Sequence, residues 1–325
     1  MVEQTFQGAV QDELSQVDRH IGEFFAVSGG LVGQVSRHVL ATNGKRLRPT
    51  LLLLVARRQG RVSETAVLAA SVVELIHIAT LIHDDSIDRS MLRRGLPTIN
   101  SIYSDQVSII MGDFVYSKAF ALLVDHGLFA EMRILAQAAH VMSHGEMLQL
   151  ERKNRLHSTE AEYLEIIDEK TASLFAAACE IGAMARGVDE DGVAAWRRFG
   201  REYGRAFQIT DDLFDFIGEE AVMGKARGSD IRSGRVTLPL IAALGNASAR
   251  ERARIEEIVM GGGMVDGLWE ELVAFIDAKG GVDYCLEQAA HHAREAASIA
   301  GDLEVDADSR FALAAVVEQV VRRRR

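Results

Sequence analysis

Proline and cysteine are scarce in this chain, and each scarcity narrows the range of folds. Only 3 of the 325 residues are proline: Pro49, Pro97 and Pro239. Because proline interrupts helices and favours turns, its rarity permits long helices and argues against a turn-rich β fold. The 2 cysteines, Cys179 and Cys285, lie far apart in apolar surroundings. Their small number excludes a disulfide scaffold and argues against a metal–thiolate site. We interpret them as two buried thiols of a protein in the reducing cytosol.

A surplus of positive charge and a targeting segment are also lacking. The formal net charge is −11, from 36 Lys and Arg against 47 Asp and Glu. This argues against nucleic acid as a partner, because phosphate binding needs a basic field. Residues 1–16 are polar and acidic, unlike a signal peptide. The best candidate for a membrane span, residues 68–82, is short and contains Glu74 and His77. We therefore expect a cytoplasmic protein.

Apolar residues with helical spacing are abundant. They make up 48% of the chain, which is enough for a sizeable core. Their three- and four-residue spacing predicts a helix over residues 68–82. Further long helices are expected over residues 106–124, 128–152, 159–184 and 193–217. The glycine and proline breaks between them are too short for interdomain linkers. We therefore predict an all-α fold with one domain over residues 1–325.

The first chemical signal is the acidic cluster Asp84-Asp85-Ser86-Ile87-Asp88, which directly follows residues 68–82. On a helix, Asp84 and Asp88 project from one face. Two such carboxylates repel each other unless a cation lies between them. Mg²⁺ fits, because it prefers oxygen ligands and shares its remaining positions with water and substrate phosphates. A lone cluster is more often a solvated helix end, but its position after a buried run indicates a cavity mouth.

A second cluster, Asp211-Asp212-Leu213-Phe214-Asp215, has the same spacing. It also ends an apolar, aromatic-containing stretch, residues 199–216. One such cluster is weak support for a metal site, whereas two with identical spacing are strong support. Together they could hold several Mg²⁺ ions across a cleft, with a diphosphate bridging them.

Two pairs of basic residues are candidate counter-charges for a bound diphosphate. Lys45 and Arg48 stand beside Pro49, which suits the first turn of a helix, where anions are favoured. Arg93 and Arg94 follow the first acidic cluster after a short loop, and guanidinium groups suit phosphate oxygens. Either pair alone would be interpreted as surface charge. The alternation of basic loops with acidic helix ends favours a site for a diphosphate and Mg²⁺.

These stretches together resemble the trans-isoprenyl diphosphate synthase family. The resemblance covers nearly the whole chain in the right order. The matching stretches are GKRLRP at 44–49, ELIHIATLIHDDSID at 74–88, RRGLPT at 93–98, GD at 112–113, GEMLQL at 145–150, EKTASLF at 169–175, GRAFQITDDLFDF at 204–216, GK at 224–225 and GSDIRSGRVTLPLI at 228–241. The resemblance implies a single large helical bundle of the isoprenoid synthase type with a central cavity.

The resemblance also implies roles for individual residues. The residues implied to hold the diphosphate of isopentenyl diphosphate are Lys45, Arg48, His77 and Arg94. The implied Mg²⁺ ligands are Asp84, Asp85, Asp88, Asp211, Asp212 and Asp215, with Arg93 beside the allylic diphosphate. The residues implied to surround the allylic diphosphate and the developing cation are Lys170, Thr171, Gln208 and Lys225. Without the resemblance, His77 would be interpreted as a core histidine. Arg235 is a departure, because the family usually has lysine there, and arginine keeps the charge but differs in geometry.

The implied reaction ionises an allylic diphosphate, condenses the cation with isopentenyl diphosphate and then releases a proton. Ala79 and Thr80 lie about one helical turn, ~5.4 Å, before the first cluster and are small enough to leave a tail channel open. Tyr116 and Phe120 are the next bulky candidates for its floor, and ordinary core packing explains them equally well. We therefore predict a medium or long product of roughly six to ten isoprene units.

Three other functions stay open at this point. A geranylgeranyl or farnesyl diphosphate synthase would make a shorter product. A class I terpene cyclase would usually carry a different second metal motif, without Asp215, and would not need Lys45, Arg48 and Arg94. A non-catalytic partner subunit should have lost aspartates or basic residues. The family resemblance further implies a homodimer, and the long product should partition into membranes, with quinone side chains as one use.

Overall fold

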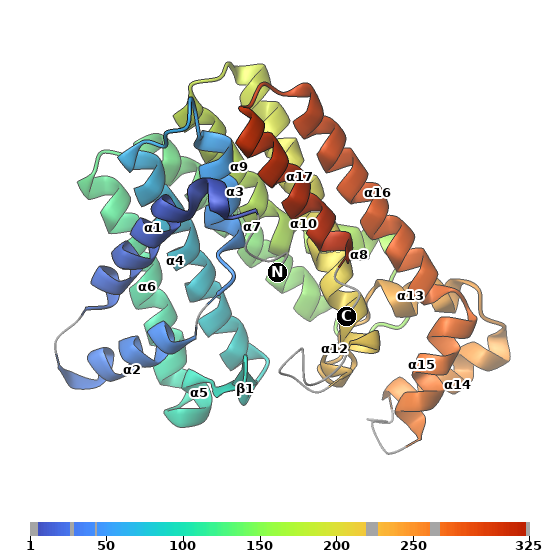
Figure 1. Cartoon of the computed structure of the whole chain (residues 1–325). Coiled ribbons are helices and arrows are strands. Elements are labelled where there is room, and N and C mark those ends of the chain that lie inside the picture. Colours follow the sequence, from blue (N-terminus) through green and yellow to red (C-terminus); the bar gives the residue numbers. More distant parts are fainter. Residues whose placement is uncertain (1–5, 27–28, 43, 219–226, 261–266, 323–325) are drawn as a thin grey trace. The chain divides into compact units, whose positions relative to one another are not determined.

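The computed structural model describes residues 6–26, 29–42, 44–218, 227–260 and 267–322, and they form an all-α structure (Figure 1). In this part of the chain, the only strands are β1 (Leu92–Arg93) and β2 (Leu96–Pro97), which pair in one small antiparallel hairpin. The predicted fold class is therefore confirmed. The chain divides into two compact units, each assembled from three segments. The expectation of a single domain stays a prediction.

The first unit comprises Met1–Ala139, Leu174–Gly200 and Ala297–Val316. Its elements are η1 (Gly8–Val10), α1 (Gln11–Phe25), α2 (Gly30–Ala41), α3 (Leu47–Ala56), α4 (Glu64–Ile87), the hairpin, α5 (Ile99–Ile102), α6 (Asp105–Asp125), the start of α7 (Phe129–Glu151), α9 (Ser173–Arg186), the start of α10 (Glu190–Ile217), the end of α16 (Gly281–Asp302) and most of α17 (Ala307–Arg322). Helix α4 packs against α1, α3 and α6. The site therefore begins on a helix that is held on several sides.

The apolar character of α4 explains its central place. Ser63 caps its first turn by accepting a hydrogen bond from the Ala66 N–H at 3.2 Å. By length and composition alone, α4 and α6 could each cross a membrane. However, 67% of the apolar stretch of α4 and 33% of that of α6 is buried inside the protein. Because core helices share this composition, we interpret α4 as the core helix of its unit.

The second unit comprises His140–Ser173, Arg201–Ala296 and Val317–Arg325. It contains the end of α7, α8 (Glu160–Ile167), a π-helical segment (Asp168–Ala172), most of α10, α12 (Ser229–Arg232), α13 (Leu238–Gly245), α14 (Ala249–Met260), α15 (Leu268–Ala278) and most of α16. One of its cores joins Tyr163 and Ile167 of α8 with Ile209 and Leu213 of α10. These buried side chains fix the part of α10 that carries Asp211.

The π-helical segment is the one departure from the predicted course of the helix over residues 159–184. There α8, the segment Asp168–Ala172 and α9 follow one another directly. π-helical turns are rare and often mark functional sites. This one contains Lys170 and Thr171, which the sequence singles out.

Candidate active site

The first acidic cluster lies at the C-terminal end of α4, as predicted. Asp88 continues the helical backbone, and its N–H donates to the Asp84 carbonyl at 2.8 Å. Asp84 and Asp88 are partly exposed, whereas Asp85 is buried. Arg93 Nε donates to Asp85 Oδ2 at 2.7 Å, while Asp85 Oδ1 is buried without a hydrogen-bond partner among the described residues. Burial raises the pKa of Asp85, although Arg93 works against this.

The hairpin after α4 carries two of the predicted phosphate ligands. Arg94 and Gly95 form its turn, with φ of 52° and 78°. Two positive φ values are what a two-residue hairpin requires, and glycine adopts them without strain. The turn sets Arg93 against Asp85. It sets Arg94 beside Gly44, since a Cβ at Gly44 would lie 3.2 Å from Arg94 Nη1.

A pocket in the first unit gathers these groups, and we call it the basic pocket. Its charged and imidazole-bearing lining includes Arg46, Glu74, His77, Asp85, Arg93 and Arg94. Three arginines thus face two carboxylates. Burial and the neighbouring Arg93 lower the pKa of Arg94. Because an anion would relieve this surplus of positive charge, the pocket is suited to bind one.

Arg48 and His77 contact each other at the edge of this charge cluster. Arg48 lies in the first turn of α3, and its Nη1 is 3.2 Å from His77 Nε2. The guanidinium carbon lies 4.2 Å from the centre of the Phe175 ring. Burial, with Arg48 next in importance, holds the pKa of His77 well below its ordinary value. His77 is therefore neutral at pH 7, with Nε2 accepting from Arg48.

The second acidic cluster lies near the end of α10, and its three aspartates have different surroundings. Asp211 is exposed, Asp212 is buried and Asp215 is completely buried. Asp212 accepts hydrogen bonds from Tyr163 Oη and Gln208 Nε2, both at 2.7 Å. Burial and the nearby Asp230 raise the pKa of Asp212 to about 8. Asp211 is thus the member of the second cluster most accessible to a metal ion from solvent.

Asp215 makes different contacts from the other two aspartates of its motif. Its two carboxylate oxygens accept hydrogen bonds from Ser229 Oγ at 2.7 Å and from the Asp230 N–H at 3.0 Å. These contacts tie the first residues of α12 to α10. The structure therefore gives Asp215 an anchoring role, and its binding of metal stays a prediction.

Replacing Asp215 by asparagine tests this distinction. The amide can accept at only one of the two sites, so a buried donor would lose its partner. We expect the free energy of unfolding to fall by about 1–3 kcal/mol, measured by urea denaturation, with the Mg²⁺ concentration for half-maximal activity unchanged. A normal stability with a raised Mg²⁺ requirement would instead identify Asp215 as a metal ligand.

A chain of hydrogen bonds links the π-helical segment to the second acidic cluster. Thr171 Oγ1 donates to Gln208 Oε1 at 2.7 Å, and Gln208 in turn donates to Asp212. Lys170 Nζ donates to Gln149 Oε1 at 2.7 Å and pairs with Glu146. The structure therefore connects Thr171 and Gln208 to Asp212, whereas Lys170 contacts Gln149 and Glu146 of α7.

Glycine permits the close approach of α7 to the π-helical segment. A Cβ at Gly145 would lie 2.7 Å from the Lys170 backbone nitrogen. No other residue fits there without displacing the backbone that carries Lys170. Gly145 belongs to the quoted GEMLQL stretch, to which sequence reasoning assigned no role.

Two predicted site residues remain, Lys225 and Arg235. Lys225 lies outside the described residues. Arg235 Nη2 donates to Asp230 Oδ1 at 2.9 Å, and the Arg235 N–H donates to the Asp230 carbonyl at 2.8 Å. Arg235 thus stabilises the loop after α12, next to the anchor formed by Asp215.

Sequence reasoning assigned no role to three further residues. Tyr163 binds Asp212, and no spacing rule connects two residues so far apart in the chain. Arg46 and Glu74 lie in quoted motifs, but their contact joins two separate elements, at 2.8 Å. Only their place within those motifs could have drawn attention to them.

The proposed channel residues lie on α4 and α6. Ala79 is fully buried, and Tyr116 and Phe120 are partly buried. The rings of Tyr116 and Phe120 are nearly parallel, with centres 6.3 Å apart, and His83 stacks on the other side of Tyr116 at 6.1 Å. The three rings form a short aromatic row in the first unit.

The donor atoms of both acidic clusters fit Mg²⁺. In the described ranges, no three His, Cys, Asp or Glu side chains form a ready-made metal site. Mg²⁺ characteristically takes one or two carboxylates and completes its shell with water and substrate phosphates. The exposed Asp211 and the partly exposed Asp84 and Asp88 suit such partial coordination.

Known proteins match this chain over most of its length. The family model described as polyprenyl synthetase matches residues 30–274. An all-trans-nonaprenyl-diphosphate synthase (geranyl-diphosphate specific) from Rhodobacter capsulatus is 36% identical over 288 residues, covering 88% of each chain. An octaprenyl diphosphate synthase from Haemophilus influenzae is 35% identical over 266 residues, covering 82% of this chain and 80% of the relative. A polyprenyl synthase from Caulobacter crescentus, solved with calcium and isoprenyl diphosphate, superposes with a TM-score of 0.93 at 35% identity, covering 99% of this chain and 98% of that one.

Proposed function

The chain belongs to the polyprenyl synthetase family, and from that premise we propose that it elongates an allylic diphosphate with isopentenyl diphosphate, in trans geometry, to a medium- or long-chain polyprenyl diphosphate. The observation that carries the proposal is the basic pocket beside the first acidic cluster. Asp85 lines that pocket together with Arg93 and Arg94. A site for a diphosphate substrate needs basic groups, which bind the phosphate oxygens, and acidic groups, which bind the accompanying metal ions.

The basic pocket is assigned to isopentenyl diphosphate. Lys45, Arg48, His77 and Arg94 would hold its diphosphate. Arginine supplies parallel N–H donors that match phosphate oxygens, and neutral His77 adds a donor from its other ring nitrogen. This set binds and orients the nucleophilic double bond and takes no part in bond breaking.

The two acidic clusters are assigned to the allylic diphosphate. Asp84 and Asp88, together with Asp211, would bind Mg²⁺ directly, and Asp85 and Asp212 would support them. When bound, Mg²⁺ neutralises charge on the departing diphosphate and so favours ionisation. Arg93, fixed by Asp85, would add a positive charge to the same leaving group.

The remaining polar residues would stabilise the allylic cation and keep its position fixed. Thr171 and Gln208 supply oxygen and nitrogen groups held by the hydrogen-bond chain to Asp212, and the Lys170 ammonium is held by Gln149 and Glu146. Lys225 is proposed for the same region from the family resemblance. The apolar side chains of α3 and α4 would exclude water, which would otherwise capture the cation. The proton released after condensation would leave with the diphosphate.

Product analysis tests the proposal. Purified protein with Mg²⁺, isopentenyl diphosphate and either geranyl or farnesyl diphosphate should give polyprenyl diphosphates, sized by mass spectrometry. Cyclic hydrocarbon with released diphosphate would establish a terpene cyclase instead. Absence of condensation unless a second protein is added would establish a subunit of a heteromeric synthase.

The product is proposed to contain roughly six to ten isoprene units, because the small side chain of Ala79, about one helical turn before Asp84, would leave room for a tail channel. Relatives named for eight and nine units support this range. Such a product is strongly apolar and would partition into membranes after release, while the enzyme would act in the cytoplasm.

Replacing Phe120 by alanine should lengthen the product by one or more isoprene units, because it removes the last ring of the aromatic row on α6. Mass spectrometry of the dephosphorylated products measures the distribution. Phe129→Ala is the control, since Phe129 is 59% exposed and lies outside the aromatic row. An unchanged distribution in the Phe120 variant would remove Phe120 from the channel floor.

A homodimer is proposed from the family and from the surface of α6. Ile109 and Ile110 are 48% and 60% exposed on this helix, whose apolar stretch is only 33% buried. A two-fold interface that covered them would bury apolar area on both copies. Light scattering of the Ile110→Glu variant should show a monomer where the wild type is a dimer. A dimer of unchanged stability in the variant would place the interface elsewhere.

A further inference from the structure

Two arginines of the basic pocket have a backbone conformation that side chains rarely adopt. φ is 52° at both Arg46 and Arg94, in the left-handed region. Residues other than glycine persist there only where surrounding contacts hold them, and such residues concentrate at binding sites. Arg46 immediately precedes α3, and Arg94 forms the hairpin turn. Each of the two loops that carry candidate diphosphate ligands thus contains an arginine in a strained backbone conformation.

Glu74 is the carboxylate next to both of these arginines. Its side chain is only 4% exposed, and it accepts a hydrogen bond from Arg46 Nη1 at 2.8 Å. A Cβ at Gly44 would lie 3.1 Å from Glu74 Oε1 and 3.2 Å from Arg94 Nη1, so both groups flank the same glycine. The negative charge of Glu74 also offsets part of the repulsion on Arg94 from its arginine neighbours. Such a buried charge is tolerated because it is paired.

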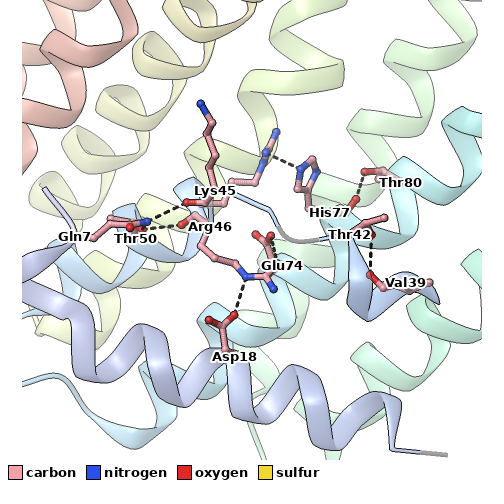
Figure 2. Close-up of polar contacts among 11 residues, drawn as sticks. Gln7, Asp18, Val39, Thr42, Lys45, Arg46, Thr50, Glu74, His77 and Thr80 are labelled. Atoms are coloured by element: carbon pink, nitrogen blue, oxygen red, sulfur yellow. Dashed lines mark hydrogen bonds and ion pairs between the residues drawn. The ribbon is translucent and has the colours of Figure 1, made fainter. Parts of the chain in front are cut away.

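The side chain of Arg46 lines the basic pocket but is held there by two carboxylates, Glu74 and Asp18. Its Nε donates a hydrogen bond at 2.9 Å to Oδ1 of Asp18, which belongs to α1. Figure 2 shows the Arg46 side chain directed toward Glu74 and Asp18, whereas the Lys45 side chain leaves the loop in the opposite direction. Gln7 holds the same loop from outside by donating to the Lys45 carbonyl at 3.0 Å. Arg46 therefore fastens the loop that presents Lys45 and Arg48.

We infer that Glu74 is a positioning residue for isopentenyl diphosphate, which fixes the loop of Lys45 and Arg48 and the turn of Arg94 in one arrangement. This inference rests on the proposed function, because it takes the basic pocket as the isopentenyl diphosphate site. Glu74 does not touch the substrate. Its loss should weaken the binding of one substrate and leave the allylic substrate unaffected.

The Glu74→Gln variant tests the inference, because glutamine keeps the shape and removes the charge. We expect KM for isopentenyl diphosphate to rise about tenfold, with KM for the allylic diphosphate within about twofold of the wild-type value. Glu74→Asp keeps the charge and should recover part of the affinity. A purely structural role would raise both KM values together or lower kcat and the melting temperature alone.

Gln7→Ala provides a second variant that leaves the buried ion pair intact. It should raise KM for isopentenyl diphosphate about threefold without changing the melting temperature, and it decides the matter if Glu74→Gln does not fold. Unchanged KM values for isopentenyl diphosphate in the folded variants, with an active wild type, would overturn the inference. A wild type that condenses no substrate would instead contradict the proposed function.

Discussion

Asp84→Asn should lower kcat by about a thousandfold, because it removes a carboxylate that we assign to the metal ions of the leaving diphosphate. The asparagine keeps the size of the side chain and should leave the fold intact. Rates with a short allylic primer, measured with saturating substrates at several Mg²⁺ concentrations, give the size of the effect. Removal of Mg²⁺ by a chelator should abolish the wild-type activity to a similar extent.

The matched control for this variant is Asp125→Asn. Asp125 is the last residue of α6 and is exposed, so its charge is lost without any change at the clusters. It should retain wild-type kcat. If Asp84→Asn kept more than about a tenth of wild-type kcat at saturating Mg²⁺, the assignment of Asp84 as a metal ligand would be wrong.

Arg48→Ala should raise KM for isopentenyl diphosphate about a hundredfold, because charge-assisted hydrogen bonds to phosphate are each worth about 1.5–3 kcal/mol. Arg48 is positioned for this by its place in the first turn of α3 and by its contacts with His77 and Phe175. Steady-state kinetics with each substrate varied in turn measures the effect. KM for the allylic diphosphate should change much less.

Two further variants separate charge from geometry at this position. Arg48→Lys keeps the charge and loses the planar pair of donors, so its KM should rise about tenfold. Arg198→Ala, on the exposed face of α10, removes a charge away from the pocket and should have no effect. Equal KM increases for both substrates in Arg48→Ala would contradict the assignment of Arg48 to isopentenyl diphosphate.

The sequence predicts the helices well, because their apolar spacing is regular and proline is rare. The stretch 106–124 corresponds to α6 (Asp105–Asp125), and the stretch 193–217 to most of α10 (Glu190–Ile217). The π-helical segment at Lys170 is not predictable in this way, because one extra residue in a turn barely alters the spacing of apolar residues. It is recognisable only from backbone hydrogen bonds.

The candidate site is predictable as a set of residues but not as a set of contacts. The motif treats Asp211, Asp212 and Asp215 alike, yet Asp211 is exposed, whereas Asp212 and Asp215 are buried and have different partners. The difference arises from Tyr163 and Ser229, which lie in other elements. Likewise, the pairing of Arg46 with Glu74 depends on how α3 and α4 pack, which local sequence does not determine.

A double-mutant cycle between Asp84→Asn and Asp211→Asn tests most directly whether both acidic clusters serve the ionisation of the same allylic diphosphate. Single-turnover rates of the wild type, both single variants and the double variant are compared. If each cluster is needed for one and the same step, the double variant should be barely slower than the slower single variant, because residues that act as a unit are not additive. A further fall of about a thousandfold in the double variant, as expected for independent contributions, would contradict the account.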